Sequence, residues 1–404
     1  MQILLNKKIL LGITGGIAAY KSCELIRLFQ KAGADVKVIM TPNATRFITP
    51  LTVSSLCGSP AVIDMFATSG SGIDHIEYTR WADLMVIAPA SANTLAKITH
   101  GIADNFLTTA VLATETPLLV APAMNVKMYQ NQATQENIDV LKKRGVRFSG
   151  PEVGYQACGE SGPGRMTEPQ NIFRTAAELL LDQNKNKKIV ITAGPTQEPL
   201  DPVRCLTNLS SGKMGYALAQ AAAVMGWKTT LISGPVTLEM PVGVEALKVK
   251  TAAEMMDAVW QNCKDANCFI GCAAVADFRP EKVAPNKIKK SSDEESLKLI
   301  LTKNPDIIAS LASLDHLYTV GFAAETENLL NYARNKLHNK KLNMIIANDV
   351  SKKDIGFNSD FNQAVIITDN GDEIAIPRMS KDDLALRIIN EIENKLQGKK
   401  NEKH

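Results

Sequence analysis

Short runs rich in β-branched residues alternate with segments of helical periodicity along the whole chain, and this alternation restricts the fold more than any other feature. In the first half we expect strands at Ile9 to Ile13, Val36 to Met40, Leu84 to Ala88 and Leu118 to Ala121, with a first helix over Ala18 to Lys31. Such alternation is typical of βαβ units, in which helices cover both faces of a parallel sheet. The chain is therefore expected to be an α/β protein.

A polar, charged stretch, DQNKNKK, interrupts this pattern after Leu181, and IVITAGPT then restarts it. The second half offers strand candidates at Thr229 to Ser233, Phe269 to Ala273, Thr319 to Phe322, Met344 to Ala347 and Ala364 to Thr368. A chain of 404 residues exceeds what one hydrophobic core usually serves. We therefore predict two doubly wound α/β domains, residues 1–187 and 188–404, with the boundary in the polar stretch.

Local signals place several helix starts and one turn in the second half. Thr251 with Glu254 forms a capping box, and Ser380 with Asp383 is expected to start the final helix. Asn304 followed by Pro305 predicts an N-cap with proline at the first helical position. The residues from Asp369 to Asp372 predict a tight turn.

The charge and cysteine content exclude several functional classes. With 45 basic and 42 acidic residues, the chain has no broad field that favours nucleic acid or membrane surfaces. The seven cysteines and five histidines show no metal-ligand spacing, which leaves any metal ligands unknown. The apolar stretch at the start is too short and too interrupted by glycine to span a bilayer. We expect a reduced, cytoplasmic protein whose ligands are small molecules.

Two kinds of polar turn follow the first-half strands. The segment LLGITGGIAAYK places Gly12, Thr14 and Gly15 between a strand and a helix, where backbone N–H groups favour a phosphate. The glycines are equally compatible with mere close packing. A dinucleotide site would need an acidic residue after the next strand, and that strand ends in Thr41. A nicotinamide-dependent dehydrogenase, the alternative enzyme class, is thereby disfavoured.

Later strands end in PASANT and PAMN, which place small polar groups where open α/β sheets bind ligands. Together with GITGGIAAYK, PLTVSSL and DHIEYTRWAD, these motifs resemble the flavin-dependent cysteine decarboxylases, and the first half resembles phosphopantothenoylcysteine decarboxylase over nearly its whole length. The resemblance implies a flavodoxin-like or Rossmann-like fold that binds FMN. The residues it places near the flavin are Thr14, Gly15, Ser54, Ser91, Asn93 and Thr94.

The resemblance also implies that His75 and Asn125 contact the substrate and that Cys158 donates a proton from a loop that closes over it. Without the resemblance, a histidine between Asp74 and Glu77 is more often a surface residue. Cys158 lies in the glycine-rich segment GPEVGYQACGESGPGRM, which predicts a mobile loop, and an incidental loop cysteine is the alternative. The implied reaction removes the carboxyl group of 4'-phosphopantothenoylcysteine, with the flavin as a temporary electron acceptor.

In the second half, a strand leads into TQEPLDPVRCLTNLSSGKMG and then a helix. A standard P-loop is excluded because Lys213 is followed by Met214, but the loop still concentrates polar and basic side chains at a helix start. Further on, Asp277 and a basic run beginning at Lys287 suit Mg²⁺ and triphosphate chemistry. A run such as KIKK is more often only solvated surface.

These segments, with NPDII, VGFAAET and IIANDV, resemble the bacterial phosphopantothenate/cysteine ligases over residues 188–396. The resemblance implies a Rossmann-like domain that uses CTP with Mg²⁺ to join cysteine to 4'-phosphopantothenate through an acyl-cytidylate. It implies that Arg204 and Asn208 serve the acyl intermediate and that Lys287 stabilises the transition state. The nucleotide would be surrounded by Asp277, Lys287, Pro305, Asp306, Ile307, Ile308, Phe322, Lys336 and Lys340.

The leading hypothesis is a bifunctional enzyme that performs both reactions. A binding or regulatory protein that kept the flavin fold and lost catalysis is the other alternative; such a chain should have lost His75 or Cys158, and both are present. The resemblance further implies a homo-oligomer with trimeric contacts in the first half and dimeric contacts in the second, up to a dodecamer.

Overall fold

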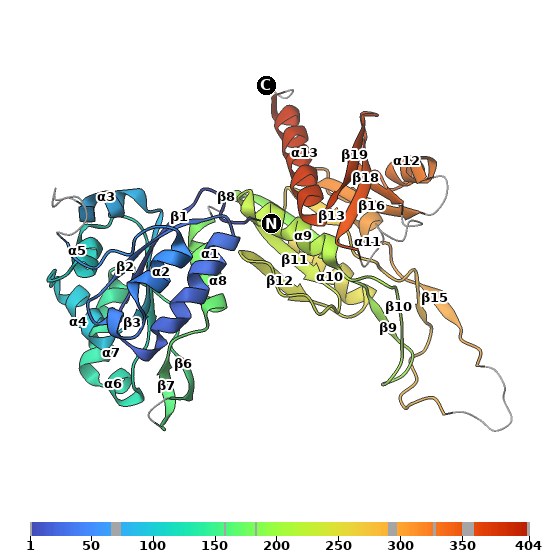
Figure 1. Cartoon of the computed structure of the whole chain (residues 1–404). Coiled ribbons are helices and arrows are strands. Elements are labelled where there is room, and N and C mark those ends of the chain that lie inside the picture. The colour runs from blue at the N-terminus through green and yellow to red at the C-terminus, as the bar shows by residue number, and fades with distance from the viewer. Residues whose placement is uncertain are drawn as a thin grey trace. The chain divides into compact units, whose positions relative to one another are not determined.

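The computed structural model describes residues 2–65, 74–156, 159–181, 184–289, 297–325, 329–349 and 359–401. The chain divides into two compact units, residues 1–180 and 181–404 (Figure 1). The second unit opens on strand β8 (Asn184–Ala193), which takes up most of the polar stretch that the sequence marks as the boundary. Each unit is an α/β structure built on its own sheet, as the alternation predicts.

The first unit contains a five-stranded parallel sheet of order β2-β1-β3-β4-β5, the flavodoxin-like order. Its strands are β1 (Lys8–Ile13), β2 (Asp35–Met40), β3 (Leu84–Ala90), β4 (Leu118–Pro122) and β5 (Arg147–Phe148). The four expected strands are confirmed. β3 and β4 are buried along their full length, as strands covered on both faces should be.

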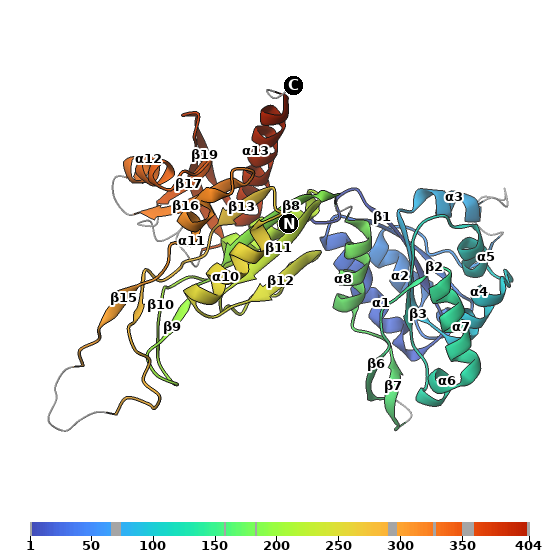
Figure 2. The ribbon, with the colours of Figure 1, turned by 180° about the vertical axis from the view of Figure 1, so that it is seen from behind.

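Two helical layers enclose this sheet (Figures 1 and 2). The helix pair α1 (Lys21–Lys31) and α8 (Pro169–Leu180) packs together, with α2 (Pro50–Cys57) against α1. The other layer contains α3 (Asp74–Trp81), α4 (Ala92–His100), α5 (Phe106–Ala113) and α7 (Gln132–Lys143), and α6 (Val126–Gln130) adjoins α7. The segment expected as one helix over residues 18–31 begins with a 3₁₀ turn, Ile17–Tyr20, before α1.

The glycine-rich segment around residues 150–166 differs from the expected mobile loop. It forms an antiparallel hairpin of β6 (Glu152–Tyr155) and β7 (Ser161–Arg165). Several of its glycines sit where a side chain would collide; a Cβ on Gly164, for example, would lie 2.4 Å from the carbonyl oxygen of Met124. The glycines therefore serve close packing of the hairpin rather than looseness. Cys158, which comes between β6 and β7 in the sequence, lies outside the described residues.

The second unit contains an eight-stranded sheet of order β12-β11-β8-β13-β16-β17-β18-β19. Its further strands are β11 (Trp227–Ser233), β12 (Val244–Lys248), β13 (Cys268–Gly271), β16 (Tyr318–Glu325), β17 (Met344–Asp349), β18 (Phe361–Thr368) and β19 (Glu373–Ser380). The first six strands in this order are parallel, and β18 and β19 are antiparallel. The expected strands are confirmed, except that β13 ends at Gly271 rather than Ala273.

Helices cover both faces of this second sheet. α9 (Lys213–Val224) packs against α13 (Lys381–Asn401), and α10 (Ala252–Cys263) packs against β8 and β11. The remaining helices are α11 (Ile307–Ser310) and α12 (Leu329–Asn339). Two small ribbons, β9 (Gln197–Pro199) with β10 (Cys205–Thr207) and β14 (Phe278–Pro280) with β15 (Leu301–Lys303), extend from the sheet.

The local signals of the second half are mostly confirmed. The capping box of Thr251 and Glu254 starts α10, and Ser380 caps α13 by accepting the N–H of Asp383. The turn at residues 369–372 joins β18 to β19. The expected N-cap at Asn304 is wrong, because Asp306 caps α11 and the amide of Asn304 instead donates to the carbonyl oxygen of Ala276 at 2.8 Å.

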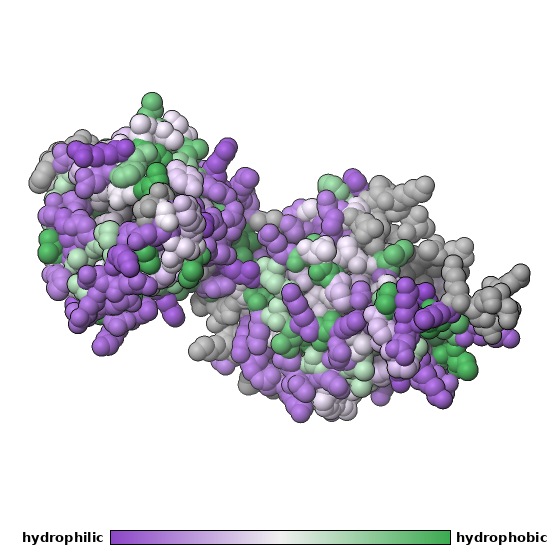
Figure 3. Space-filling view, turned by 90° about the horizontal axis from the view of Figure 1, so that it is seen from below, coloured by the Kyte–Doolittle hydropathy of each residue, from purple (hydrophilic) through white to green (hydrophobic). Residues whose placement is uncertain are grey.

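Figure 3 shows hydrophilic side chains over most of one face of each unit, broken by small apolar patches. None of the described helices combines the length and apolar character that crossing a bilayer requires.

Candidate active sites

Thr14 joins the carboxyl ends of β1 and β3 in the first unit. Its buried hydroxyl donates to the carbonyl oxygen of Pro89 at 2.8 Å and accepts the backbone N–H of Ser91 at 3.0 Å. A valine here would keep the shape and lose both bonds. The hydroxyl thus fixes how the glycine turn after β1 sits beside the PASANT segment, at the edge where open α/β sheets bind ligands.

Ser91 also caps the next helix, as its position in the sequence suggests. Its hydroxyl accepts the N–H of Thr94 at 3.3 Å at the start of α4. Thr94 is buried, whereas Asn93 on the first turn is exposed. Ser54 in α2 is half-buried and accepts the N–H of Ala61 at 2.9 Å. Ser91, Thr94 and Ser54, which the resemblance places near the flavin, therefore also make hydrogen bonds that stabilise the fold. Asn93 is the exposed member of this group.

Gly15 lies where no side chain fits. A Cβ there would stand 2.6 Å from the Cβ of Asn43 and 3.0 Å from that residue's carbonyl carbon. Nearby, at the end of β2, the hydroxyl of Thr41 is buried and finds no hydrogen-bond partner among the described residues. A close backbone approach and an unsatisfied buried hydroxyl at one sheet edge fit a bound phosphate-bearing group such as a flavin nucleotide.

His75 is the second residue of α3. Its Nδ1 is buried and, within the described part of the chain, has no hydrogen-bond partner. In a surface histidine both ring nitrogens would be accessible to water. The buried Nδ1 therefore favours a functional role for His75 over an ordinary surface residue. The backbone carbonyl of His75 accepts the hydroxyl of Thr79 at 3.0 Å, which steadies the helix but not the ring.

Asn125 caps α6 and reaches across to the hairpin. Its Oδ1 accepts the N–H of Lys127 at 2.8 Å, and its Nδ2 donates to Glu160 Oε2 at 2.6 Å. Gln156, on the same hairpin, accepts the N–H of Val126 at 3.0 Å. Sequence reasoning did not find Glu160 or Gln156, because their partners lie thirty or more residues away. The amide expected to hold a substrate carboxylate is thus engaged with a carboxylate of the chain itself.

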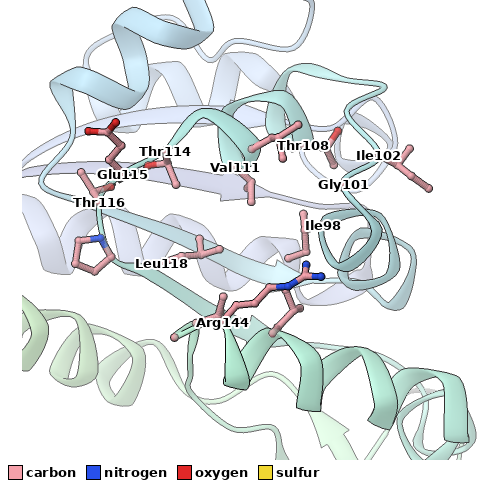
Figure 4. A pocket seen from close by; sticks show the side chains of 15 residues that line it. Ile98, Gly101, Ile102, Thr108, Val111, Thr114, Glu115, Thr116, Leu118 and Arg144 are labelled. Atoms are coloured by element: carbon pink, nitrogen blue, oxygen red, sulfur yellow. Dashed lines mark hydrogen bonds between the residues drawn. The ribbon is translucent and has the colours of Figure 1, made fainter.

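A cavity of about 540 Å³ lies at the opposite edge of the first sheet (Figure 4). It is bounded by the end of α4, by α5, and by the amino ends of β4 and β5, with Leu118 and Thr108 among its lining. Arg144 extends along it and donates to the carbonyl oxygen of Thr99 at 2.6 Å. Because it opens at the amino ends of the strands, it is separate from the site around Thr14.

In the second unit, a pocket of about 300 Å³ lies beside the segment that follows β13 and beside β16 and the end of β17. It brings together three predicted residues, Asn208, Phe322 and Lys336, from segments far apart in the sequence. Lys336 donates to the carbonyl oxygen of Phe322 at 2.8 Å, so α12 is tied to β16 at the pocket. Ser210, Ser211 and Lys213 of the SSGKMG segment form another wall.

The side-chain amide nitrogen of Asn208 already makes hydrogen bonds within the chain. Its Nδ2 lies 3.0 Å from the carbonyl oxygen of Val275 and 3.3 Å from that of Ala274. The amide therefore braces the segment after β13, which also lines the pocket. Donation from Asn208 to a ligand oxygen requires one of these bonds to be exchanged.

Three pocket residues were missed by the sequence reasoning: Asn348, Asn362 and Lys381. Asn348 Oδ1 is buried without a partner among the described residues. Lys381, at the first position of α13, is 6% exposed, and burial followed by the charge of Lys213 lowers its pKa. Only the Ser380 cap signalled this region, and a cap indicates a helix start, not a pocket.

Arg204 and Lys287, two predicted catalytic residues, do not line this pocket. Their segments meet at Asp201, whose buried carboxylate accepts the N–H of Arg204 at 2.8 Å and of Ile288 at 3.0 Å. Arg204 also donates to the carbonyl oxygen of Ile288 at 3.3 Å. Burial raises the pKa of Asp201, but these donors outweigh it, and the pKa lies below its usual range. Asp201 is a site residue that the sequence reasoning did not single out.

The remaining predicted nucleotide residues form a third group. Lys340 pairs with Asp306 at 2.9 Å, and Ile308 contacts the end of β13 at Gly271. Pro305 precedes this short turn, Ile307 is buried beneath it, and the backbone carbonyl of Asp277 accepts the N–H of Asn304 at 2.8 Å. Among the described residues, no three carboxylate, histidine or cysteine side chains converge in a metal-binding cluster.

Comparison with known proteins matches both units. Residues 2–181 match the Flavoprotein family, and residues 184–396 match the family described as DNA/pantothenate metabolism flavoprotein C-terminal domain. The "Coenzyme A biosynthesis bifunctional protein CoaBC" of Vibrio parahaemolyticus is 50% identical, covering 96% of this chain and 98% of the relative. The protein of that name from Escherichia coli (strain K12) is 48% identical, covering 96% and 97%.

Two solved structures are also similar. The crystallised C-terminal domain of a CoaBC protein is 37% identical, covers 54% of this chain and 98% of its own, and gives a TM-score of 0.46. A PPC decarboxylase mutant complexed with pantothenoylaminoethenethiol is 34% identical, covers 42% and 96%, and gives a TM-score of 0.38. On the full-length matches and the two family models, this chain belongs to the family of bifunctional coenzyme A biosynthesis proteins that carry the name CoaBC.

Proposed function

We propose that this protein joins cysteine to 4'-phosphopantothenate at the expense of CTP and then decarboxylates the product to 4'-phosphopantetheine with FMN. The observation that carries the proposal is the pocket of the second unit, which gathers Asn208, Phe322 and Lys336 at the strand ends. In a chain of this family, that pocket supports the ligase, and the edge around Thr14 and Gly15 supports the flavin site.

In the ligase reaction, the carboxylate of 4'-phosphopantothenate attacks the α-phosphate of CTP and releases pyrophosphate, with Mg²⁺ shielding the phosphates. The amine of cysteine then attacks the acyl carbon and displaces CMP. Lys287 is exposed, and its segment is anchored through the neighbouring Ile288, so its ammonium can reach bound triphosphate and offset charge there. Arg204, fixed beside that segment by Asp201, supplies a second cation.

In the decarboxylase reaction, bound FMN supplies the temporary electron acceptor that lets a carboxyl group leave from a cysteinyl residue. Thr14, Gly15, Ser91 and Thr94 would hold the flavin's phosphate and ring edge. Asn125 binds the substrate carboxylate through the amide that now meets Glu160, and His75 offers a ring nitrogen that needs a partner. Cys158 donates the final proton to carbon.

We also infer a homo-oligomer that works in the cytoplasm. Large apolar side chains are exposed next to the proposed flavin edge, on the elements that follow β1 and β2: Ile17, Tyr20, Phe47 and Leu51. A second copy of the chain covering them would remove this apolar surface from water and enclose the flavin. Trimeric contacts in the first unit and dimeric contacts in the second, giving a dodecamer, remain part of this proposal.

The test uses the purified full chain. A visible spectrum should show bound flavin, and incubation with 4'-phosphopantothenate, cysteine, Mg²⁺ and CTP should release pyrophosphate and CO₂, with ATP much less effective. Asn208→Asp provides the internal control, because it should block pyrophosphate release yet leave decarboxylation of supplied 4'-phosphopantothenoylcysteine intact. A colourless protein that takes up no FMN contradicts the first activity, and absence of CTP-dependent pyrophosphate contradicts the second.

A further inference from the structure

The PAMN turn, which ends in Asn125, is hydrogen-bonded to the hairpin of β6 and β7. The backbone N–H of Met124 donates to the carbonyl oxygen of Gly164 at 2.9 Å. The side chain of Gln156 makes two further bonds: its Oε1 accepts the N–H of Val126 at 3.0 Å, and its Nε2 donates to the carbonyl oxygen of Met124 at 3.4 Å. One side-chain amide thus binds the peptide groups immediately before and after Asn125.

Burial fixes the orientation of the Gln156 amide. The residue is 9% exposed, and Nε2 also donates to the carbonyl oxygen of Pro163 on β7 at 3.4 Å. A flipped amide would set its NH₂ group against the N–H of Val126 and its oxygen against two carbonyl oxygens, which would leave buried polar groups unsatisfied. The amide therefore keeps the orientation that holds both sides of Asn125.

Two glycines of β7 allow the hairpin to approach the turn this closely. A Cβ on Gly164 would lie 2.7 Å from Gln156 Nε2, and a Cβ on Gly162 would lie 2.6 Å from Val126 Cγ2. Gly164 also has a φ of +138°, which residues with a side chain rarely adopt. The hairpin is thus shaped to hold the backbone on either side of Asn125.

The direction of the Asn125 amide depends on this backbone. Its Oδ1 accepts the N–H of Lys127 in its own turn, and its Nδ2 extends to Glu160. The N–H of Val126 belongs to the first turn of α6 and has no partner within that helix, so Gln156 satisfies it. Without Gln156, the turn would lose two hydrogen bonds and could shift, and small shifts of a substrate-binding group lower activity strongly.

We propose that Gln156 is a positioning residue of the decarboxylase site: by holding both peptide groups that flank Asn125, it directs the Asn125 amide toward the carboxylate of the substrate. The inference rests on the proposed decarboxylase function and adds to it a residue that acts through Asn125 and not by contact with the substrate.

The first test uses the full chain with bound FMN and compares two ligands that differ in the carboxyl group. Steady-state CO₂ release gives the KM for 4'-phosphopantothenoylcysteine, and calorimetry gives the affinity for 4'-phosphopantetheine, which lacks that group. Gln156→Met should raise KM by about tenfold, the effect of one misplaced charge-assisted hydrogen bond, and leave the affinity for 4'-phosphopantetheine unchanged. Gln132→Met is the matched control, because Gln132 is exposed on α7 and contacts Glu136 there; it should behave like wild type.

The thermal midpoint and the flavin absorbance show whether each variant is folded. Should Gln156→Met fail to fold, Gln156→Asn takes its place, because its amide is one methylene too short to hold Met124 and Val126 together, and the same result is expected. Equal weakening of both ligands would show that Gln156 maintains only the shape of the site, and an unchanged KM would show that the turn does not need it. Either result overturns the inference.

A double-mutant cycle tests whether Gln156 acts through Asn125. Gln156→Met should raise KM about tenfold when Asn125 is present and less than about twofold in the background of Asn125→Ala. Independent effects of the two substitutions, or an unchanged KM in Asn125→Ala, overturn the inference. If wild type itself releases no CO₂ from 4'-phosphopantothenoylcysteine, the proposed decarboxylase function fails instead, so the two failures are distinguishable.

Discussion

The carboxylate of Asp201 accepts the backbone N–H of Ile288 at 3.0 Å, a contact between residues 87 positions apart. The same carboxylate holds the N–H groups of Val203 and Arg204 at 2.7 and 2.8 Å. One buried side chain thus joins the loop that carries Arg204 to the segment that carries Lys287. Together with the Arg204 guanidinium, which donates to the carbonyl oxygen of Ile288 at 3.3 Å, this carboxylate sets the relative position of the two segments.

We expect Asp201→Asn to slow the ligase, because an amide accepts fewer hydrogen bonds than a carboxylate and adds a donor where three donors converge. The rate of pyrophosphate release should fall by about tenfold or more while the fold survives. The pKa of Asp201 is lowered, so its contribution is present above the usual aspartate pKa and lost only as the pH falls through the lowered value. The loss in the variant should therefore be uniform across neutral pH.

Asp257→Asn is the matched control for this change, since Asp257 is exposed on α10 of the same unit. It should leave pyrophosphate release unaltered, and both variants should decarboxylate supplied substrate normally. Full ligase activity in Asp201→Asn would show that Arg204 and Lys287 do not need this link.

Glu160→Ala should lower the KM of the decarboxylase for 4'-phosphopantothenoylcysteine. Glu160 occupies the Asn125 amide at 2.6 Å, and the substrate carboxylate must take that place. Removing the competing carboxylate should reduce KM by several-fold, as expected for one charge-assisted hydrogen bond. Steady-state CO₂ release measures the change, with Glu136→Ala on α7 as the control. An increased KM would mean that Glu160 supports the site instead of competing for it.

Gly15→Ala should greatly reduce the amount of flavin that the protein binds. The added methyl group would meet Asn43 at 2.6 Å, part of the contact being backbone, so the turn after β1 must move. The ratio of flavin absorbance to protein should drop sharply. Gly16→Ala is the control for folding, because a Cβ there meets nothing within 4 Å, and its thermal midpoint should match wild type. Flavin retained at wild-type level by Gly15→Ala would remove this turn from the cofactor site.

Alkylation of Cys272 should keep accelerating with pH well beyond the range of ordinary thiols. Burial raises the pKa of this pocket cysteine to about 12, and the charge of Lys381 only partly opposes the shift. The rate should rise about tenfold per pH unit with no plateau near pH 9. Peptide mass spectrometry after iodoacetamide treatment measures it, and CTP should slow it because Cys272 lines the same pocket. A plateau below pH 9 would contradict the burial of the thiol.

The sequence predicts the α/β class and the strands well, because β-branched runs and caps are local signals. Ser91, Thr251 and Ser380 cap helices where their spacing indicates. The predicted N-cap at Asn304 is wrong because its side-chain amide donates a hydrogen bond to the carbonyl oxygen of Ala276, 28 residues away. No local pattern contains that information.

The same distinction between local and distant signals applies to the residues of the two candidate sites. Thr14 and Asn208 stand in motifs, so resemblance finds them. The places of Asp201 and Lys381 depend on distant residues: Asp201 accepts the N–H of Ile288, and Lys381 lines a pocket that also contains Asn208. Both side chains are buried, which only the folded chain reveals. The glycine-rich composition of residues 150–166 predicts a mobile loop. The close contacts around Gly164 show instead that glycine is needed there for packing of the hairpin.

The position of Lys381 has a consequence for how the protein is made. The ligase pocket is lined by residues from Asn208 to Lys381, so it is complete only when the start of α13 has left the ribosome. The first unit ends by residue 180 and can fold while the rest is still being synthesised. A growing chain should therefore acquire the competence to bind flavin first, and the competence to bind nucleotide only after the second unit has been synthesised through Lys381.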